Sequence, residues 1–256
     1  MPADTFVRWS FRRWTLRRGT LEGVPSIVPS GPAARAIADG VRARIHRGEL
    51  GPGDQLPPER LLAEQLGVGR LRVREALALL EEDGYIVARR GATGGRFVTE
   101  LVVPYNQWMD QMRRDLSELD DIVDYRIAVE CEVARLAAVR CTKTDLTAMN
   151  KAIRALERAT TPRAYKTADL AFHDALAKAS RSTRLAAAVD QARGDLFSPV
   201  DELWFDGRSD ASARDHQEIA DACDRHEGGM AAAAMARHIE HTRRDIAALL
   251  EQKVSG

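Results

Sequence analysis

Four side chains in the second half of the chain are of types that could hold a divalent metal ion. Asp169 and His173 stand at positions i and i+4, so on a helix both project from the same face. His216 and His238 follow in stretches with helical apolar spacing, and His241, one turn after His238, is an alternative ligand. Imidazole suits zinc, nickel, copper or iron, and the carboxylate also admits manganese. Spacing alone leaves a second interpretation open, in which these histidines are hydrogen-bonded structural residues or lie in solvent.

The elements that must position these groups are helices. Between residues 105 and 253 the sequence is rich in Ala, Leu, Arg, Asp and Glu, without strand-like alternation. It has no clear repeat of about 20 to 50 residues, so it predicts one bundle rather than a solenoid. The predicted helices cover residues 105–116, 120–140, 143–159, 162–179, 182–205, 211–225 and 228–252. Pro104 interrupts regular structure just before them, which predicts a linker over residues 101–105.

The segment from Pro57 to Val98 has the pattern of a winged helix-turn-helix. A short helix can begin at Pro58, because proline is tolerated in a first turn, and Gly67 ends it. A second helix begins near Arg70, after a tight turn. The apolar residues are Leu61, Leu62 and Leu66 in the first helix, and Val73, Ala76, Leu77 and Leu80 in the second. At this spacing each set predicts a buried stripe.

The outward face of the second helix carries residues of types that contact DNA. Arg70, Leu71 and Arg74 point away from the buried stripe, near the N-terminal end of the helix. Two helices joined by a tight turn place such side chains in a major groove. The planar fork of arginine binds guanine O6 and N7, or a phosphate, through two hydrogen bonds. The alternative is a plain helical hairpin with a solvated charged face.

A basic hairpin after the second helix would form the wing. Asp83-Gly84 makes a turn, and the residues beyond it alternate as in two short strands. The alternating residues are Tyr85, Val87 and Phe97. Between the strands lies a glycine-rich tip, where Arg90 and Gly91 could approach a phosphate or the minor groove.

Composition fits a two-domain regulator inside the cell. With 256 residues, of which 45% are apolar, the chain can bury a core in each of two domains. A formal net charge of zero argues against a nonspecific nucleic-acid coat protein. Three cysteines without CxxC spacing predict neither a disulfide framework nor a thiolate zinc site, and so indicate a reduced, cytoplasmic setting. No apolar run approaches the roughly 18 to 20 residues that span a membrane.

A long series of residues between Ala33 and Glu100 matches a known pattern. The matching residues are Ile45, the run from Gly48 to Pro57, Glu59-Arg60, Leu62-Ala63, Leu66-Gly67-Val68, Arg70, the run from Val73 to Leu77 and the run from Leu80 to Gly84. By these residues the segment resembles the DNA-binding domain of GntR-family bacterial transcription regulators. The resemblance implies that Arg60, Arg70 and Arg74 contact DNA, with the wing around Gly91 in the minor groove.

Three positions near the start of the second helix depart from the usual pattern of that family. Gly69 stands where Ser or Thr is common, Leu71 replaces a frequent Thr, and Arg72 replaces a frequent Pro or Thr. Glycine still serves as an N-cap but offers no hydroxyl to a phosphate, and Leu71 could touch a thymine methyl. The operator sequence therefore does not carry over from relatives.

A sparser set of residues in the second half also matches a known pattern. The set is Arg126 with Glu130, the run from Asp169 to His173 with Leu176, His216 with Ile219, and His238. By these residues the second half resembles the effector domain of the FadR subgroup, often called FCD. Many FCD domains bind metal through these Asp and His positions, so the resemblance implies a site of Asp169, His173, His216 and His238. Zinc is the first expectation, with nickel, manganese and iron as alternatives.

The same resemblance implies a small effector that carries a carboxylate. Four protein ligands leave one or two positions open on an octahedral ion, which a carboxylate or hydroxy acid can fill. Arg126 is then a candidate bidentate clamp on the anion, and a salt bridge to Glu130 is its alternative role. Arg181-Ser182 stands where relatives often have Gly-Asn, which indicates a different effector or pocket edge.

These inferences predict a mainly α protein with an N-terminal winged helix-turn-helix over residues 31–100 and a C-terminal all-α, FCD-like domain over residues 106–253. Residues 1–30 are expected to be a disordered extension, with a DNA-contacting arm as the alternative. The expected function is a cytoplasmic, homodimeric repressor that reads a pseudo-palindromic double-stranded operator and is not an enzyme. The alternatives are a metal-free acyl-CoA sensor and a metal-dependent enzyme that uses the same Asp and His cluster.

Overall fold

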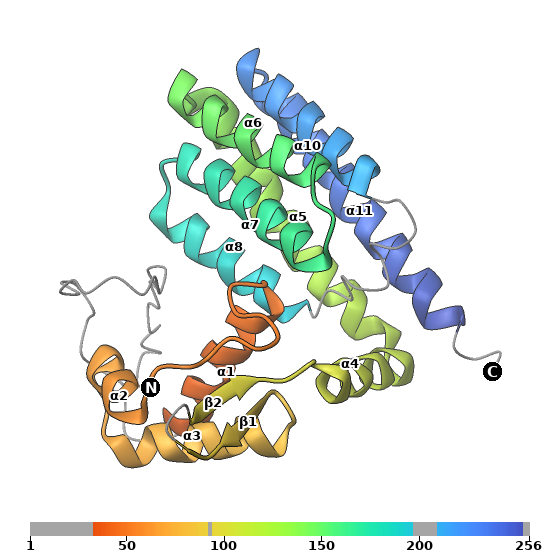
Figure 1. Ribbon diagram of the computed structural model, residues 1–256. Helices are drawn as coiled ribbons and strands as arrows, with labels where there is room; N and C mark the ends of the chain where they lie inside the picture. The colour runs from red at the N-terminus through yellow and green to blue at the C-terminus, as the bar shows by residue number, and fades with distance from the viewer. Residues whose placement is uncertain (1–32, 92–93, 197–208, 253–256) are drawn as a thin grey trace, which may run out of the picture. The chain divides into compact units, whose positions relative to one another are not determined.

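The computed structural model describes residues 33–91, 94–196 and 209–252, and these are mainly helical, as the sequence predicted (Figure 1). The extension expected over residues 1–30 lies outside the described residues, as do residues 197–205 of the helix expected over residues 182–205. That helix ends at Asp195, because Leu196 has extended backbone, so the predicted end was too late. The chain divides into two compact units. Residues 50–104 belong to the first unit with the chain before residue 43, and residues 43–49 belong to the second with the chain from residue 105 onward.

The first unit carries the predicted helix-turn-helix. Its elements in the described residues are α1 (Ala33–His46), which runs into the 43–49 segment, then α2 (Glu59–Leu66), α3 (Arg70–Glu82), β1 (Ile86–Arg89) and β2 (Gly95–Val98). Gly67 ends α2 with a φ of 64°, a left-handed conformation that glycine adopts without a Cβ clash. Gly69, in extended backbone, is the N-cap of α3. The tight turn therefore lies where the glycines predicted it.

The two helices bury the stripes that their spacing predicts, with one exception. On α3 the buried residues are Val73, Ala76, Leu77 and Leu80. On α2, Leu62 and Leu66 are buried, but Leu61 is 40% exposed and does not join them. Leu62 and Leu66 are four residues apart and share a face, whereas Leu61 is rotated from Leu62 by about 100°.

The hairpin buries Ile86 and Val98, which lie next to residues whose alternation predicted the strands. Ile86 pairs with Val98 and both are buried, whereas Val87 pairs with Phe97 and is 38% exposed. Tyr85 is buried, but it lies before β1, where its amide donates to the Leu80 carbonyl at 2.9 Å. This bond belongs to the Schellman turn that ends α3, so Tyr85 does not set the alternation of the strand.

The second unit is a helix bundle. Its helices in the described residues are α4 (Val102–Arg114), α5 (Leu116–Arg140), α6 (Lys143–Glu157), α7 (Pro162–Ala179), α8 (Thr183–Asp195), α10 (Ser209–Asp224) and α11 (Gly228–Gln252). Local sequence sets several of the starts. Thr142 forms a capping box with Asp145 at the start of α6, and Thr161 caps α7, whose first residue is Pro162.

The linker expected over residues 101–105 is helical for most of its length. Helix α4 begins at Val102, three residues before the predicted start. Pro104 lies in the first turn, where its missing N–H has no intrahelical acceptor to lose. Leu101 precedes the helix with a φ of 61°, and its amide donates to Thr99 Oγ1 at 3.1 Å.

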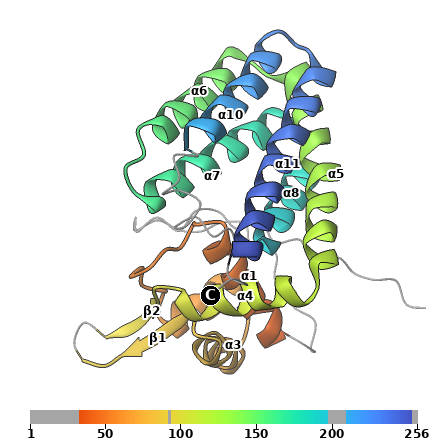
Figure 2. The ribbon, with the colours of Figure 1, turned by 90° about the vertical axis from the view of Figure 1, so that its right-hand side faces the viewer.

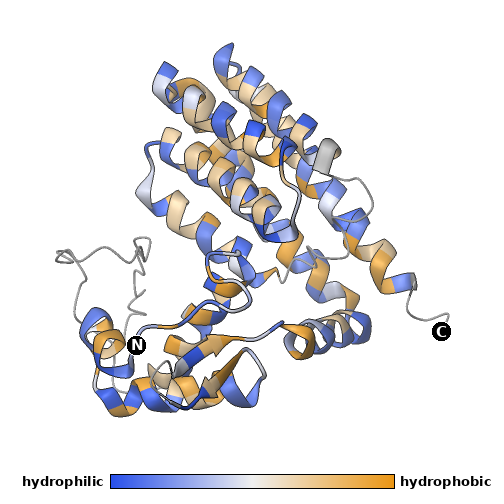
Figure 3. Cartoon of the chain, viewed as in Figure 1, coloured by the Kyte–Doolittle hydropathy of each residue, from blue (hydrophilic) through white to orange (hydrophobic). Residues whose placement is uncertain are grey.

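Helix α5 contacts most of the other helices of the bundle. It packs against α7, α8, α10 and α11, and α6 packs against α7 and α10 (Figures 1 and 2). Hydrophobic and hydrophilic residues alternate along the helices of the bundle (Figure 3). Phe172, Leu176 and Ile219 are among the largest fully buried side chains. Among the described residues, no helix is both long and apolar enough to cross a membrane.

Candidate metal centre and candidate nucleic-acid surface

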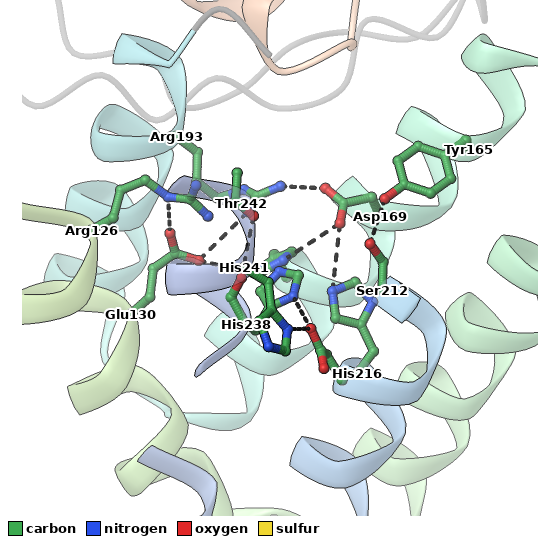
Figure 4. A network of polar contacts seen from close by, with 12 residues as sticks. Arg126, Glu130, Tyr165, Asp169, Arg193, Ser212, His216, His238, His241 and Thr242 are labelled. Atoms are coloured by element: carbon green, nitrogen blue, oxygen red, sulfur yellow. Dashed lines mark hydrogen bonds and ion pairs between the residues drawn. The ribbon is translucent and has the colours of Figure 1, made fainter. Parts of the chain in front are cut away.

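The structure brings the four predicted ligands together inside the bundle (Figure 4). Asp169 and His173 come from α7, His216 from α10 and His238 from α11. One ligand atom from each of them lies within 4.8 Å of the others. The three histidines are buried, and Asp169 is partly exposed at the edge of the cluster.

Two carboxylates outside the cluster orient two of the imidazoles. Nδ1 of His173 lies 3.0 Å from Oε2 of Glu130, which leaves its Nε2 facing Oδ1 of Asp169 at 3.7 Å. Nδ1 of His238 lies 3.4 Å from Oδ2 of Asp215. A carboxylate at one ring nitrogen fixes an imidazole so that its other nitrogen can bind a metal.

The third imidazole has no hydrogen-bond partner among the described residues. His216 stacks on Phe172, with ring centroids 4.0 Å apart, and its Nε2 lies 3.5 Å from Oδ1 of Asp169. Among the described residues, neither ring nitrogen of His216 has a hydrogen-bond partner, and neither has Nε2 of His173. A buried polar atom without a partner costs about 1 to 3 kcal/mol. A cation at the centre would bind Nε2 of His173 and one ring nitrogen of His216, so the residues present fit a metal ion.

The electrostatics of the cluster keep His173, His216 and Asp169 in the protonation states that bind metals. Burial lowers the pKa of His173 to about 4 and that of His216 well below its usual value, so both rings are neutral at pH 7. Burial alone would raise the pKa of Asp169, but the Arg193 guanidinium and the imidazoles outweigh it and hold that pKa well below its usual range. Neutral imidazole and ionised carboxylate are the ligand forms.

Arg126 forms the salt bridge that was the alternative to its role as an effector clamp. Its Nε donates to Oε1 of Glu130 at 2.7 Å, and both side chains are buried. Burial would raise the pKa of Glu130, but Arg126 and Arg193 lower it well below the usual value. Arg126 therefore lies beside the cluster with one N–H already engaged.

Sequence reasoning missed two residues of the site. Arg193, on α8, places Nη2 2.5 Å from Oδ2 of Asp169 and Nη1 3.6 Å from Oε2 of Glu130. Oδ2 of Asp215 lies 3.4 Å from Nδ1 of His238 and 2.8 Å from Nδ1 of His241. The alternative ligand His241 thus contacts Asp215 and is not a member of the cluster. Asp215 directly precedes His216, but no spacing signal singles out Arg193.

The candidate DNA-contacting residues lie on the exposed face of the first unit. Arg70, Leu71, Arg72 and Arg74 are all exposed at the start of α3, and Leu71 has 63% of its surface accessible. Arg60 on α2 is exposed and pairs with Glu64 at 2.6 Å. Exposed pairs of this kind contribute about 0 to 1 kcal/mol, so they leave the guanidinium available to a phosphate or a base.

The wing tip is also exposed. Arg90 and Gly91 are both accessible, and Gly91 has a φ of 111°, which glycine tolerates. Glu59, for which the sequence predicted no role, links β2 to α3. It accepts from Arg96 on β2 at 2.9 Å and from Arg74 on α3 at 3.4 Å.

Comparisons with known proteins match both halves. Residues 33–95 match the family model of bacterial regulatory proteins of the gntR family, and residues 121–241 match the FCD domain. The chain is similar to the putative HTH-type transcriptional regulator RmpR of Mycobacterium gastri, at 34% identity over 229 residues, covering 86% of this chain and 81% of RmpR. It is also similar to the putative L-lactate dehydrogenase operon regulatory protein of Escherichia coli (strain K12), at 37% identity over 155 residues, covering 57% and 58% of the two chains.

One solved structure has a similar fold. The structure of E. coli McbR/YncC matches with a TM-score of 0.53 and 19% identity, covering 87% of this chain and 98% of that one. At this identity the likeness concerns the fold alone.

Proposed function

This chain belongs to the GntR family of bacterial transcription regulators and carries an FCD effector-binding domain, and we propose that it senses a small organic acid through a divalent metal ion. It is a regulator and not an enzyme. The observation that carries the proposal is the convergence of Asp169, His173, His216 and His238 within 4.8 Å.

The donor set supports a resident metal ion. Three imidazoles and one carboxylate suit zinc first, and nickel, iron or manganese next. Glu130 and Asp215 stand behind two of the imidazoles as orienting carboxylates, which is the arrangement found around bound metals. When bound, the ion would supply positive charge and an open position to an anionic effector.

The effector we propose is a small carboxylate or hydroxy acid. Arg126 lies beside the cluster and keeps N–H groups beyond the one given to Glu130, so it can contact the same anion. The relative named for an L-lactate dehydrogenase operon is in keeping with an acid of this class.

We propose that the first unit reads the operator through α3, α2 and the wing. The contacting residues would be Arg60, Gly69, Arg70, Leu71, Arg72, Arg74, Arg90 and Gly91. Exposure of the arginines at the start of α3 supports a major-groove role, and exposed Leu71 can meet a thymine methyl. Residues 31–100 would then be the reading domain, and residues 106–253 the sensing and dimerising domain.

A homodimer would place two reading domains on adjacent half-sites of a pseudo-palindrome, in the cytoplasm. For repression, effector and DNA must favour different arrangements of the protein. Effector binding then weakens DNA binding.

A thermal-shift screen of organic acids on zinc-loaded and chelator-treated protein tests this function. An acid present at 100 times its Kd adds about 2.7 kcal/mol to the free energy of unfolding, so it raises Tm. We expect such an acid to act only on zinc-loaded protein and to lose its effect in His216→Ala. Protein that holds no metal, and is stabilised by acyl-CoA without it, would contradict the proposal.

A further inference from the structure

We propose that Arg193 is a second effector-binding residue. In the metal-free protein its guanidinium pairs with Asp169, and when Asp169 ligates the metal the guanidinium becomes available to the carboxylate of the effector. The inference rests on the proposed metal and effector function and adds the residue that links the two. It concerns α8, a helix that supplies none of the four metal ligands.

The two oxygens of Asp169 face different partners. Oδ1 faces the imidazoles, at 3.7 Å from Nε2 of His173 and 3.5 Å from Nε2 of His216. Oδ2 faces Arg193, with Nη2 at 2.5 Å (Figure 4). A metal held by the imidazoles and Oδ1 would therefore share one carboxylate with the Arg193 guanidinium.

The charges around the cluster explain why Arg193 would then need a new anion. Glu130 already has Arg126 at 2.7 Å, and Arg193 is farther from it, at 3.6 Å. Asp215 faces His238 and His241 on the other side of the cluster. Asp169 is thus the main counter-charge of Arg193. A divalent cation bound at Oδ1 would neutralise part of the carboxylate charge and so weaken its attraction for the guanidinium. The metal and Arg193 together would carry positive charge that an acid can balance.

The guanidinium also has an unused donor. Nε of Arg193 is buried and has no hydrogen-bond partner among the described residues. Arginine binds a carboxylate through two parallel N–H bonds, and a buried guanidinium with a free N–H offers part of that geometry. Arg126 uses its own Nε on Glu130, so Arg193 has the more available donor of this type.

The test uses the full-length protein loaded with cobalt(II), whose visible spectrum reports changes in its ligands. Acetate is the probe, and acetamide is its neutral counterpart. The variants are Arg193→Gln, Arg193→Lys and the matched control Arg184→Gln, which changes an exposed arginine on the same helix. Cobalt content and the acetate concentration that half-completes the spectral change are measured for each protein.

We expect acetate, and not acetamide, to change the spectrum of the wild-type protein. Because Arg193→Gln loses a charge-assisted hydrogen bond to the acetate, the half-saturating acetate concentration should rise about 10-fold or more. Arg193→Lys should fall between, because lysine keeps the charge without the fork. Arg184→Gln should behave as the wild type.

A wild-type acetate response in Arg193→Gln would overturn the role of Arg193 and leave the metal function standing. If Arg193→Gln does not bind cobalt, the inference is tested with Arg193→Lys instead. A half-saturating acetate concentration above that of the wild type supports the inference, and an equal concentration overturns it. Wild-type protein that binds no cobalt, or binds it without responding to acetate, would overturn the proposed function and this inference with it.

Discussion

At the scale of single residues, the site depends on nitrogen atoms that have no other partner. His216 is the clearest case, because both of its ring nitrogens are buried without a hydrogen bond among the described residues. Its stacking on Phe172 fixes the plane of the ring but satisfies neither nitrogen. This combination is costly for a structural histidine and useful for a ligand.

Removing this imidazole should remove the metal. We expect His216→Ala to weaken zinc binding at least 10-fold and to abolish the zinc-dependent rise in Tm, because one of four ligands is lost. Isothermal titration and metal analysis measure the affinity and the content. His241→Ala is the matched control, since His241 is half-exposed and contacts Asp215 outside the cluster. Equal zinc affinity in His216→Ala and wild type would contradict the ligand assignment.

The buried imidazoles also predict how metal-free protein responds to acid. Burial lowers the pKa of His173 from its ordinary 6.5 to about 4, so the unfolded chain takes up this proton first as the pH falls. The neutral His173 ring therefore makes its full contribution to the free energy of unfolding above pH 6.5, and this contribution declines as the pH falls toward 4. Between pH 7 and pH 5 the loss from His173 alone is about 2 kcal/mol.

Urea unfolding of chelator-treated protein at the two pH values measures this loss. His173→Asn should show a smaller difference between pH 7 and pH 5, because the titrating group is gone. A free energy of unfolding that stays constant from pH 7 to pH 5 in the wild type would show that the ring is not held neutral by burial.

At the scale of elements, α3 presents one face to the core and the other to solvent. The stripe of Val73, Ala76, Leu77 and Leu80 is buried, so the arginines on the opposite face are not part of the core. Glu59 on α2 pairs with Arg74 on α3 and with Arg96 on β2, so it connects the three elements.

Arginines on this face should act on DNA binding alone. We expect Arg74→Ala to weaken operator binding by about 10- to 100-fold, the effect of losing one base or phosphate contact. Metal content should stay unchanged and Tm should change little, because the exposed pair of Arg74 with Glu59 contributes about 0 to 1 kcal/mol. Fluorescence anisotropy on an operator fragment at physiological salt measures the affinity. Arg237→Ala, an exposed arginine on α11, is the control. Equal affinities of the two variants would refute the assignment of α3 as the recognition helix.

The end of α3 depends on a glycine in a left-handed conformation. Gly84 has a φ of 76°, and a Cβ there would lie 3.0 Å from Cβ of Val103. Gly53 has a φ of 81° but open space around it. We expect Gly53→Ala to cost about 1 kcal/mol of unfolding free energy from backbone strain, and Gly84→Ala to cost more. Urea unfolding compares the two, and an equal cost would show that contact with Val103 adds nothing.

At the scale of the whole molecule, the reading and sensing functions must be linked in free energy. If an acid lowers operator affinity, operator DNA must lower the affinity for the acid by the same factor, typically about 5- to 150-fold. We expect titrations of the acid with and without operator, and of operator with and without acid, to give one factor. Substitution of His216 should remove both effects together. Two unequal factors would mean that the binding events do not share one equilibrium.

The sequence by itself determined the order and type of the elements. Apolar spacing is a local property, so it predicted α2, α3 and the helices of the bundle, and the residues of the α3 stripe. Glycines marked the tight turn because their conformational freedom is intrinsic. The ligand set needed the resemblance to a family in addition, since spacing alone left structural histidines as an alternative. Helix ends were less determined, as Pro104 in the first turn of α4 shows.

Only the tertiary structure decided which distant residues meet. Arg193 faces Asp169, and Glu130 and Asp215 orient the imidazoles of His173 and His238. These partners lie on different helices, and their contacts depend on how α5, α7, α8, α10 and α11 are rotated in the bundle. No local pattern encodes that rotation, because it follows from the packing of all the helices at once.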